Sequence, residues 1–295
     1  MHINWAFLLV VVIWSTTPLT IQFSTVGSSF NFGVTARMLL GLAICWVILY
    51  LKKESLAFSK QLNQHYLYAG LGIFVTMSLV YFSAQHVPSG MIAVVFGLTP
   101  IVTGIFAYFL LSEAFYQLNK IAGLILGLLG LTVIFQHSLK YNPEMNIGFI
   151  ALTLAMGFQS FIAVKLKQIN AHVSALHTTT GALMVSAPLF LLSFFMTDGQ
   201  LPEIITDKAL WSIAYLALFG SVIGFAAYYY LIRHTSVKTV GLIPLITPVF
   251  TLILGNLFNQ ETLSLLQLSG IILVLIGLGI YEYGNRRLWS KKPST

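Results

Sequence analysis

Charge is scarce in this sequence. Asp, Glu, Lys and Arg make up 8% of its 295 residues, whereas an ordinary soluble domain carries about 25%. Hydrophobic residues make up 57%, and ten helices of about 20 residues, the length that crosses a hydrocarbon core, would occupy about 200 residues. The composition therefore excludes a soluble globular protein and leaves no length for a separate soluble domain.

Cysteine and catalytic motifs are also nearly absent. The one cysteine, Cys45, lies in an apolar run, which excludes an intramolecular disulfide and a multi-cysteine metal site. No glycine-rich lysine motif for ATP is present, and the eight acidic residues are mostly dispersed. We therefore expect no enzyme activity, no cofactor and no metal. A membrane-embedded transferase would need clustered Asp, Glu or His, and an ion channel would need a selectivity loop; these are the alternatives to a carrier.

The apolar runs predict an all-α integral membrane protein with ten transmembrane helices. They cover residues 4–23, 30–51, 66–85, 89–111, 121–136, 147–164, 175–196, 209–232, 237–258 and 266–283. With the N-terminus in the cytoplasm, twelve of the fifteen basic residues lie inside and only Lys140 and Lys208 outside. The positive-inside rule then predicts both termini in the cytoplasm of a bacterial-type inner membrane. The basic residues behind the net charge of +7 lie between the apolar runs, where they orient the helices. No nucleic-acid partner is therefore expected.

The sequence repeats itself at an offset of 148 positions. The aligned pairs are Tyr81-Phe82 with Tyr229-Tyr230, His86 with His234, Thr99-Pro100 with Thr247-Pro248, and Glu113 with Glu261. An offset of 147 then aligns Gly123 with Gly270 and Gly130 with Gly277. The repeat predicts two halves, 1–141 and 142–295, of five spans each. Because five is odd, the second half enters the membrane from the opposite side, as in many secondary carriers with a site near the midplane.

These paired motifs resemble the ten-span EamA-type members of the drug/metabolite transporter superfamily. The residues that carry the resemblance over essentially the whole chain are Thr99-Pro100, Thr247-Pro248, Ser112-Glu113, Gln260-Glu261, the glycine-rich helices after each Glu, and Trp14-Ser15. The resemblance implies a carrier of amino acids, nucleobases, vitamins, sugars or drugs, often an exporter. The first span lacks the membrane-embedded glutamate of the small four-span relatives, so their proton exchange is not implied.

The predicted substrate site combines helix breaks with polar aromatic side chains. Pro100 and Pro248 lie near the middle of two spans, where each removes a backbone hydrogen bond and the freed carbonyl must face protein or a watery cavity. A simple packing kink is the alternative. The side chains predicted to contact a small organic substrate are Trp14, Tyr81, Phe96, Phe158, Gln159 and Tyr229. Lipid-facing or core-filling positions are the alternative for the aromatic members.

Arg37 is the one strongly charged residue well inside a span. Insertion scales put the cost of such a charge at about 2.5–3.5 kcal/mol, so we expect Arg37 to have a partner and include it in the substrate site. That partner is either an anionic group of the substrate, or helix carbonyls and lipid headgroups that the side chain reaches by snorkelling.

Gating or coupling roles are predicted for titratable residues at helix ends, namely His86, Glu113, His177, His234 and Glu261. The two glutamates form a paired gate contact, or else they are loop charges or caps of the following helices. Histidine titrates near neutral pH, although an interfacial histidine also serves as an end-cap. No Asp or Glu lies in the middle third of a span, which favours facilitated exchange or histidine coupling over glutamate-based antiport.

Small residues recur every three or four positions at Gly123, Gly127 and Gly130. Such spacing lets two helices approach closely, either within the chain or in a dimer, and we favour packing within the chain. The expected partners are thus a small-molecule substrate and the lipid bilayer, with the protein a monomer or a weak homodimer.

Overall fold

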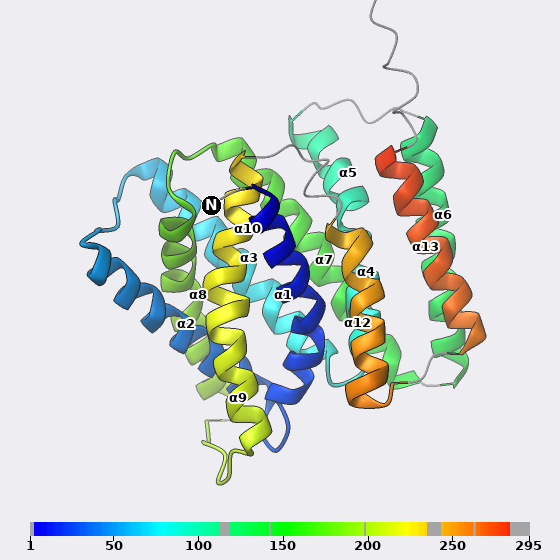
Figure 1. Cartoon of the computed structure of the whole chain (residues 1–295), viewed down its shortest axis with the longest axis horizontal. Helices are drawn as coiled ribbons and strands as arrows, with labels where there is room; N and C mark the ends of the chain where they lie inside the picture. The colour runs from blue at the N-terminus through cyan, green and yellow to red at the C-terminus, as the bar shows by residue number, and fades with distance from the viewer. Residues whose placement is uncertain are drawn as a thin grey trace, which may run out of the picture.

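The computed structural model describes residues 3–111, 118–141, 143–197, 199–234, 243–261 and 264–283, without the side chains of 131, 134–141, 143, 232, 233, 244, 245, 282 and 283. Within these ranges every regular element is a helix (Figure 1). The helices are α1 (Ile3–Ser24), α2 (Phe30–Lys52), α3 (Lys60–Ser83), α4 (Ser89–Phe96), α5 (Thr99–Leu111), α6 (Leu118–Tyr141), α7 (Pro143–Ile169), α8 (Ala175–Thr197), α9 (Asp207–Tyr215), the π-helix η1 (Leu216–Ile223), α10 (Gly224–His234), α12 (Ile243–Asn259) and α13 (Leu265–Tyr283).

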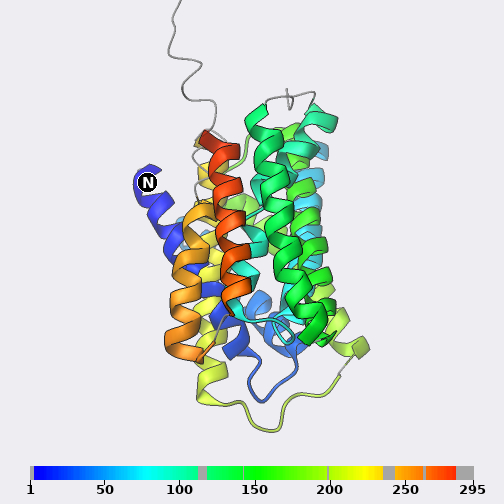
Figure 2. The ribbon, with the colours of Figure 1, turned by 90° about the vertical axis from the view of Figure 1, so that its right-hand side faces the viewer.

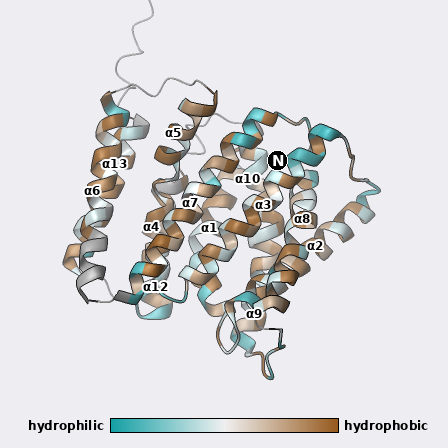
Figure 3. Cartoon of the chain, turned by 180° about the vertical axis from the view of Figure 1, so that it is seen from behind, coloured by the Kyte–Doolittle hydropathy of each residue, from teal (hydrophilic) through white to brown (hydrophobic). Residues whose placement is uncertain are grey.

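The helices suit a bilayer in length and in surface. Among the described residues, seven helical segments are long and apolar enough to cross a membrane, and three shorter apolar segments accompany them. Hydrophobic residues cover the middle of the helices, while hydrophilic residues gather toward their ends (Figure 3). Large side chains such as Phe195 and Trp211 are 64% and 74% exposed. Exposed apolar surface of this extent is typical of contact with lipid, so the chain is a multi-pass membrane protein.

Helices from the two ends of the chain pack against each other throughout the bundle (Figures 1 and 2). The first helix, α1, packs against α10 and α12, and α2 packs against α8 and η1. The third helix, α3, lies between α7 and α8, while α6 pairs with α13 at one side of the molecule. The two halves of the sequence therefore do not form separate bodies, because almost every helix buries its face against a helix from the other half.

The contact between α6 and α13 is built from glycine backbone. A Cβ atom at Gly123 would lie 2.5 Å from the carbonyl oxygen of Gly277, and one at Gly130 would lie 2.6 Å from that of Gly270. The partner number falls as the number along α6 rises, so the two helices run antiparallel. The small-residue spacing therefore serves packing within the chain, as the sequence analysis favours.

A proline interrupts one of the two predicted broken spans but not the other. The fourth span ends as α4 at Phe96 and resumes as α5 at Thr99. Pro100 has no amide hydrogen for the Phe96 carbonyl, and the Thr99 hydroxyl donates to that carbonyl at 2.6 Å instead. Pro248, by contrast, lies inside the continuous helix α12. Of the symmetric pair of helix breaks expected from the sequence, the described residues therefore contain the break at Pro100 and not one at Pro248.

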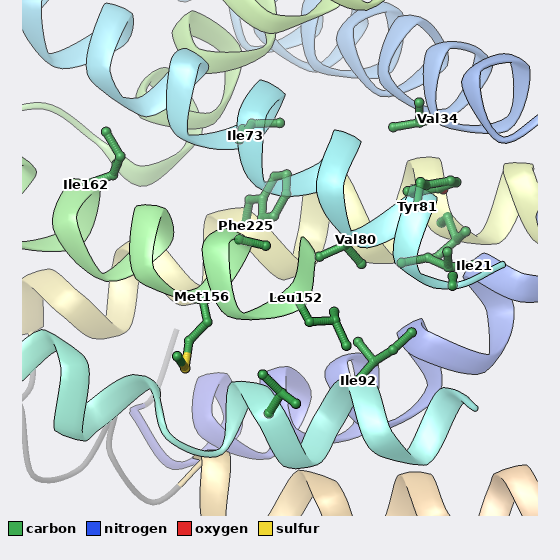
Figure 4. Close-up of a cluster of buried hydrophobic side chains, with 14 of the residues drawn as sticks. Ile21, Val34, Ile73, Val80, Tyr81, Ile92, Leu152, Met156, Ile162 and Phe225 are labelled. Atoms are coloured by element: carbon green, nitrogen blue, oxygen red, sulfur yellow. The ribbon is translucent and has the colours of Figure 1, made fainter. Parts of the chain in front are cut away.

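The core lies where α3, α4, α7 and α8 meet. Its fully buried members include Tyr81, Phe149, Leu152 and Phe190. Figure 4 shows Val80 of α3, Phe225 of α10 and Leu152 of α7 among the buried side chains of this cluster. A second, smaller cluster of buried side chains joins α1 to α10 and to the start of α12, and Trp14 and Tyr228 pack against it. Its members are Ala6, Val10, Val11, Ala227, Leu231 and Ile243.

Candidate functional site

Three helices bring polar aromatic side chains together around Trp14. This half-buried residue lies near the middle of α1. Its ring centroid is 4.9 Å from that of Tyr228 in α10, with the planes tilted by 41°. The Tyr228 hydroxyl in turn lies close enough to the side chain of Gln159 in α7 to interact with its amide. We call Trp14, Gln159 and Tyr228 the central cluster; it offers stacking surface and hydrogen-bonding groups at one place.

The helix α12 meets α1 beside this cluster. The Thr251 hydroxyl donates to the carbonyl of Ser15 at 2.9 Å and lies within one turn of the buried Pro248. On α1 itself, Pro18 provides no amide hydrogen for the carbonyl of Trp14, four residues earlier. The backbone next to Trp14 therefore has an unusual share of polar groups for the middle of an apolar helix.

The other predicted substrate residues lie outside the central cluster. Tyr229 is 5.7 Å from Tyr228, centroid to centroid, and is half-buried. Phe158 pairs with Phe161 at 6.4 Å, and Phe96 packs against the apolar core where α4 ends. Pro100 lies in the first turn of α5. The aromatic residues thus include core-filling members, as the alternative interpretation allowed.

A second polar group surrounds Arg37. Its side chain is 1% exposed, and its Nε donates to the Ser221 hydroxyl at 2.9 Å. The Cζ atom lies 6.0 Å from the ring centroid of Tyr81, which is completely buried. This position excludes the snorkelling expected as one alternative, because the guanidinium does not reach the protein surface. Tyr81 accompanies Arg37 and Ser221, not Trp14, and we call these three residues the Arg37 cluster.

Glu261 ties together the ends of three helices. Its Oε1 and Oε2 atoms accept hydrogen bonds from the amides of Ser89 at 2.9 Å and Gly90 at 3.3 Å, in the first turn of α4. The Asn259 side chain donates to Glu261 Oε1 and to Gln22 Oε1 at the end of α1, both at 3.0 Å. The glutamate therefore caps a helix of the other half, and not the helix that follows it. Glu113 lies outside the described residues.

The three predicted coupling histidines are far apart along the chain and each has local partners. His86 follows α3 and packs on Phe82 at 4.8 Å. His177 bonds with Ser174 and lies 3.7 Å from Glu54. His234, at the end of α10, bonds to the Tyr230 carbonyl. The structure thus gives each one a helix-end environment, as the end-cap interpretation describes.

Two residues of these clusters are absent from the sequence-based site. Tyr228 belongs to the run Tyr228-Tyr229-Tyr230, and the sequence does not show which of these tyrosines lies on the helix face that meets Trp14. Ser221 is a single serine in an apolar helix, and no sequence pattern sets it apart. Across the described ranges, no group of three His, Cys, Asp or Glu side chains is placed to hold a metal ion.

Comparison with known proteins identifies a family. Residues 2–136 and residues 146–281 each match the EamA-like transporter family. Protein PecM of Dickeya dadantii is 27% identical over 213 residues, which cover 72% of this chain and 70% of PecM. The uncharacterized transporter YoaV of Bacillus subtilis is 24% identical over 259 residues, covering 85% of this chain and 87% of YoaV.

Two further likenesses concern a named efflux pump and a fold. A probable amino-acid metabolite efflux pump of Salmonella typhimurium is 26% identical over 208 residues, covering 68% of this chain and 69% of the pump. A solved crystal structure matches 98% of this chain and 99% of its own chain with a TM-score of 0.71 at 19% identity, and therefore shares the fold. Together with the two matched ranges, these findings show that this multi-pass chain is a membrane transporter and belongs to the EamA-like transporter family.

Proposed function

We propose that this protein is a secondary transporter that exports or exchanges small organic metabolites, amino acids or similar compounds, across a bacterial inner membrane by alternating access. The observation that carries the proposal is the central cluster, in which Trp14, Gln159 and Tyr228 meet from three helices. Cavities between repeats near the midplane are where secondary transporters bind substrate. The resemblance to a named amino-acid metabolite efflux pump supports the substrate class and the direction.

The architecture that we propose is ten spans in two inverted repeats, 1–141 and 142–295, with both termini cytoplasmic. The two ranges that match the family support the duplication. The α6 and α13 contacts support the inversion, because Gly123 meets Gly277 whereas Gly130 meets Gly270. At the offset of 147, each glycine contacts the counterpart of the other one, which is the pattern that a two-fold axis produces. The antiparallel course of these helices supports an axis that lies in the membrane plane.

The carboxylate at Glu261 supplies the gate contact of this proposal. It joins α12 to the first turn of α4, and so connects the two repeats at the outer end of the bundle in the proposed orientation. Alternating access then requires this contact to form when the outer side closes and to break when it opens. In this proposal a gradient of the substrate or of an ion drives net transport.

The experiment is counterflow in liposomes that contain the purified protein. Vesicles preloaded with unlabelled amino acids, nucleosides or vitamins are tested for saturable uptake of the labelled compound. We expect Trp14→Ala and Gln159→Ala to slow exchange without lowering protein abundance. For Trp14→Ala, the loss of one stacked aromatic ring should weaken substrate binding by about 1.5 kcal/mol, which is roughly a tenfold loss of affinity.

The matched control is Trp5→Ala on the same helix, where the indole is 69% exposed. It should keep the kinetics of the unmodified protein. Unsaturable ionic current would instead identify a channel, and unchanged exchange in both central variants would show that the central cluster is not the substrate site.

A further inference from the structure

Arg37 is a buried cation whose hydrogen-bonding capacity is only partly used. Its Nε has the Ser221 hydroxyl as acceptor, but its Nη1, also buried, has no hydrogen-bond partner among the described residues. The hydroxyl of Tyr81, beside it, is likewise buried without a partner in the described chain. A guanidinium donates only, and a tyrosine hydroxyl also donates. Two donors thus lie unused in one place, where leaving a buried polar group unbonded costs free energy.

Among the described residues, the only ion pairs within 4.0 Å are those of Lys52 and His177 with Glu54, and none involves Arg37. The sequence has no Asp or Glu in α2 (Phe30–Lys52) or in α3, α8 and η1, which pack on it. The helix α9 also packs on α2, and its one carboxylate, Asp207, lies in its first turn. A buried arginine with an acidic partner is common, whereas an isolated one marks a functional site in membrane proteins. Within the described part of the chain, the guanidinium therefore lacks an anionic partner.

The surroundings are shaped to fit the guanidinium. A Cβ atom at Gly220 would lie 2.8 Å from Nη2 of Arg37, so a residue without a side chain is needed at this point of η1. Gly220 and Ser221 belong to a π-helical segment, a rare geometry that is frequent at functional sites. These features keep the Arg37 guanidinium inside the helix bundle and away from the membrane surface.

The Arg37 cluster also lies close to the central cluster. A Cβ atom at Gly224 would lie 3.8 Å from the indole nitrogen of Trp14. Gly220, against Arg37, and Gly224, against Trp14, are about one helical turn apart along η1 and α10, or about 6 Å at the rise of an α-helix. A small molecule with an acidic group and an apolar body spans this distance.

We propose that Arg37 and Tyr81 bind the carboxylate of the transported substrate, whose apolar or aromatic part contacts Trp14 and Tyr228. The two carboxylate oxygens accept from Arg37 Nη1 and from the Tyr81 hydroxyl, and their charge neutralises the guanidinium. This inference rests on the proposed transport function and narrows its substrates to organic acids, including amino acids.

The test is ligand binding to the purified full-length protein in nanodiscs, measured by thermal shift and by titration. The probes are acids paired with their neutralised amides: phenylacetate with phenylacetamide, hydrocinnamate with hydrocinnamamide, L-phenylalanine with L-phenylalaninamide, and L-leucine with L-leucinamide. We expect at least one acid to bind about tenfold or more tightly than its amide, the effect of a hydrogen bond to a charged group.

The decisive variant is Tyr81→Phe, because the hydroxyl that it removes has no partner in the unliganded protein. The melting temperature without ligand should stay unchanged or rise, while the acid binds about tenfold more weakly and the amide binds as before. Tyr66→Phe on the same helix is the matched control and should leave the preference for acids intact. Arg37→Gln should abolish that preference, and Arg37→Lys should retain part of it.

Two results overturn the inference: no acid in the panel binds better than its amide, or the preference persists in Tyr81→Phe and Arg37→Gln. Its failure is separable from failure of the transport proposal. Exchange of neutral amides in liposomes that depends on Trp14 would preserve the transporter and refute the carboxylate site. Absence of exchange for acids and amides alike would refute transport even if an acid binds.

Discussion

A single carboxylate, Glu261, connects the end of α12 to the beginning of α4, while Asn259 extends the connection to α1. Glu261→Gln removes the charge and leaves one oxygen where two accepted from Ser89, Gly90 and Asn259. We expect the contact to weaken by about 1 kcal/mol, because the site is half-exposed and the hydrogen bonds involve a charged group. The ends of α1 and α4 should then separate more often.

This separation is measurable at Val87, a residue that is 3% exposed and whose carbonyl accepts from Gln22. On a Cys45→Ala background, Val87→Cys should react severalfold faster with an impermeant maleimide when Glu261→Gln is also present. Glu203→Gln, an exposed loop carboxylate, serves as control. Equal reaction rates with both glutamate variants would contradict the gate assignment.

The residue types at the site were predictable where one property decides the position. Arg37 could be selected from the sequence because a charge in an apolar helix is costly and needs a partner. Trp14 and Gln159 could be selected because they are polar residues within apolar spans. Tyr228 and Tyr229 could not be distinguished, since one residue turns a helix by about 100° and the sequence does not say which face meets α1. The partners of Glu261 were equally inaccessible, because Ser89 and Gly90 lie more than 170 residues away in the chain.

Among the elements, the pair α6 and α13 depends most directly on residue size. Gly123→Ala would place a methyl group 2.5 Å from the Gly277 carbonyl oxygen and 2.8 Å from the backbone nitrogen of Tyr281. Backbone cannot rotate away as a side chain does, so the helices must move apart. We expect a loss of roughly 1–3 kcal/mol in stability, the usual effect of overpacking, seen as a lower melting temperature in detergent.

The matched control is Gly157→Ala in α7, where an added Cβ would meet nothing within 4 Å. It should be neutral or stabilising by up to about 1 kcal/mol, because alanine favours a helix. If Gly123→Ala melts at or above the temperature of Gly157→Ala, the glycine contact is not what holds α6 against α13.

Helix existence followed from the apolar runs, since each predicted run coincides with described helix over most of its length. The positions at which helices are interrupted could not be predicted as well from the sequence. Pro100 ends α4 because Thr99 takes over the Phe96 carbonyl, while Pro248 is accommodated within α12. The same dipeptide thus gives two outcomes, and the packing of neighbouring helices selects between them. The π-helical segment η1 had no signal in its residues Leu216–Ile223.

At the scale of the molecule, the basic residues predict which end of the bundle faces the cytoplasm. Ser59, which caps α3, should lie inside, because Lys52, Lys53 and Lys60 are close to it in the sequence. The exposed Gln200 should lie outside, because few basic residues are close to it in the sequence. On a Cys45→Ala background, impermeant maleimide should label Gln200→Cys in intact cells and Ser59→Cys only after permeabilisation. Labelling of Ser59→Cys in intact cells would reverse the orientation.

The glycine contact between α6 and α13 has a consequence for the energetics of the transport cycle. In the inverted-repeat architecture that we propose, a two-fold axis through this pair would exchange the inner and outer sides of the membrane and superimpose the pair on itself. Its energy is then the same whether the carrier opens inward or outward, so these helices cannot favour either state. Any resting preference must come from places where the halves differ. The clearest is the interrupted α4 and α5 facing the continuous α12, and the asymmetry of the carrier therefore resides in how one proline is accommodated.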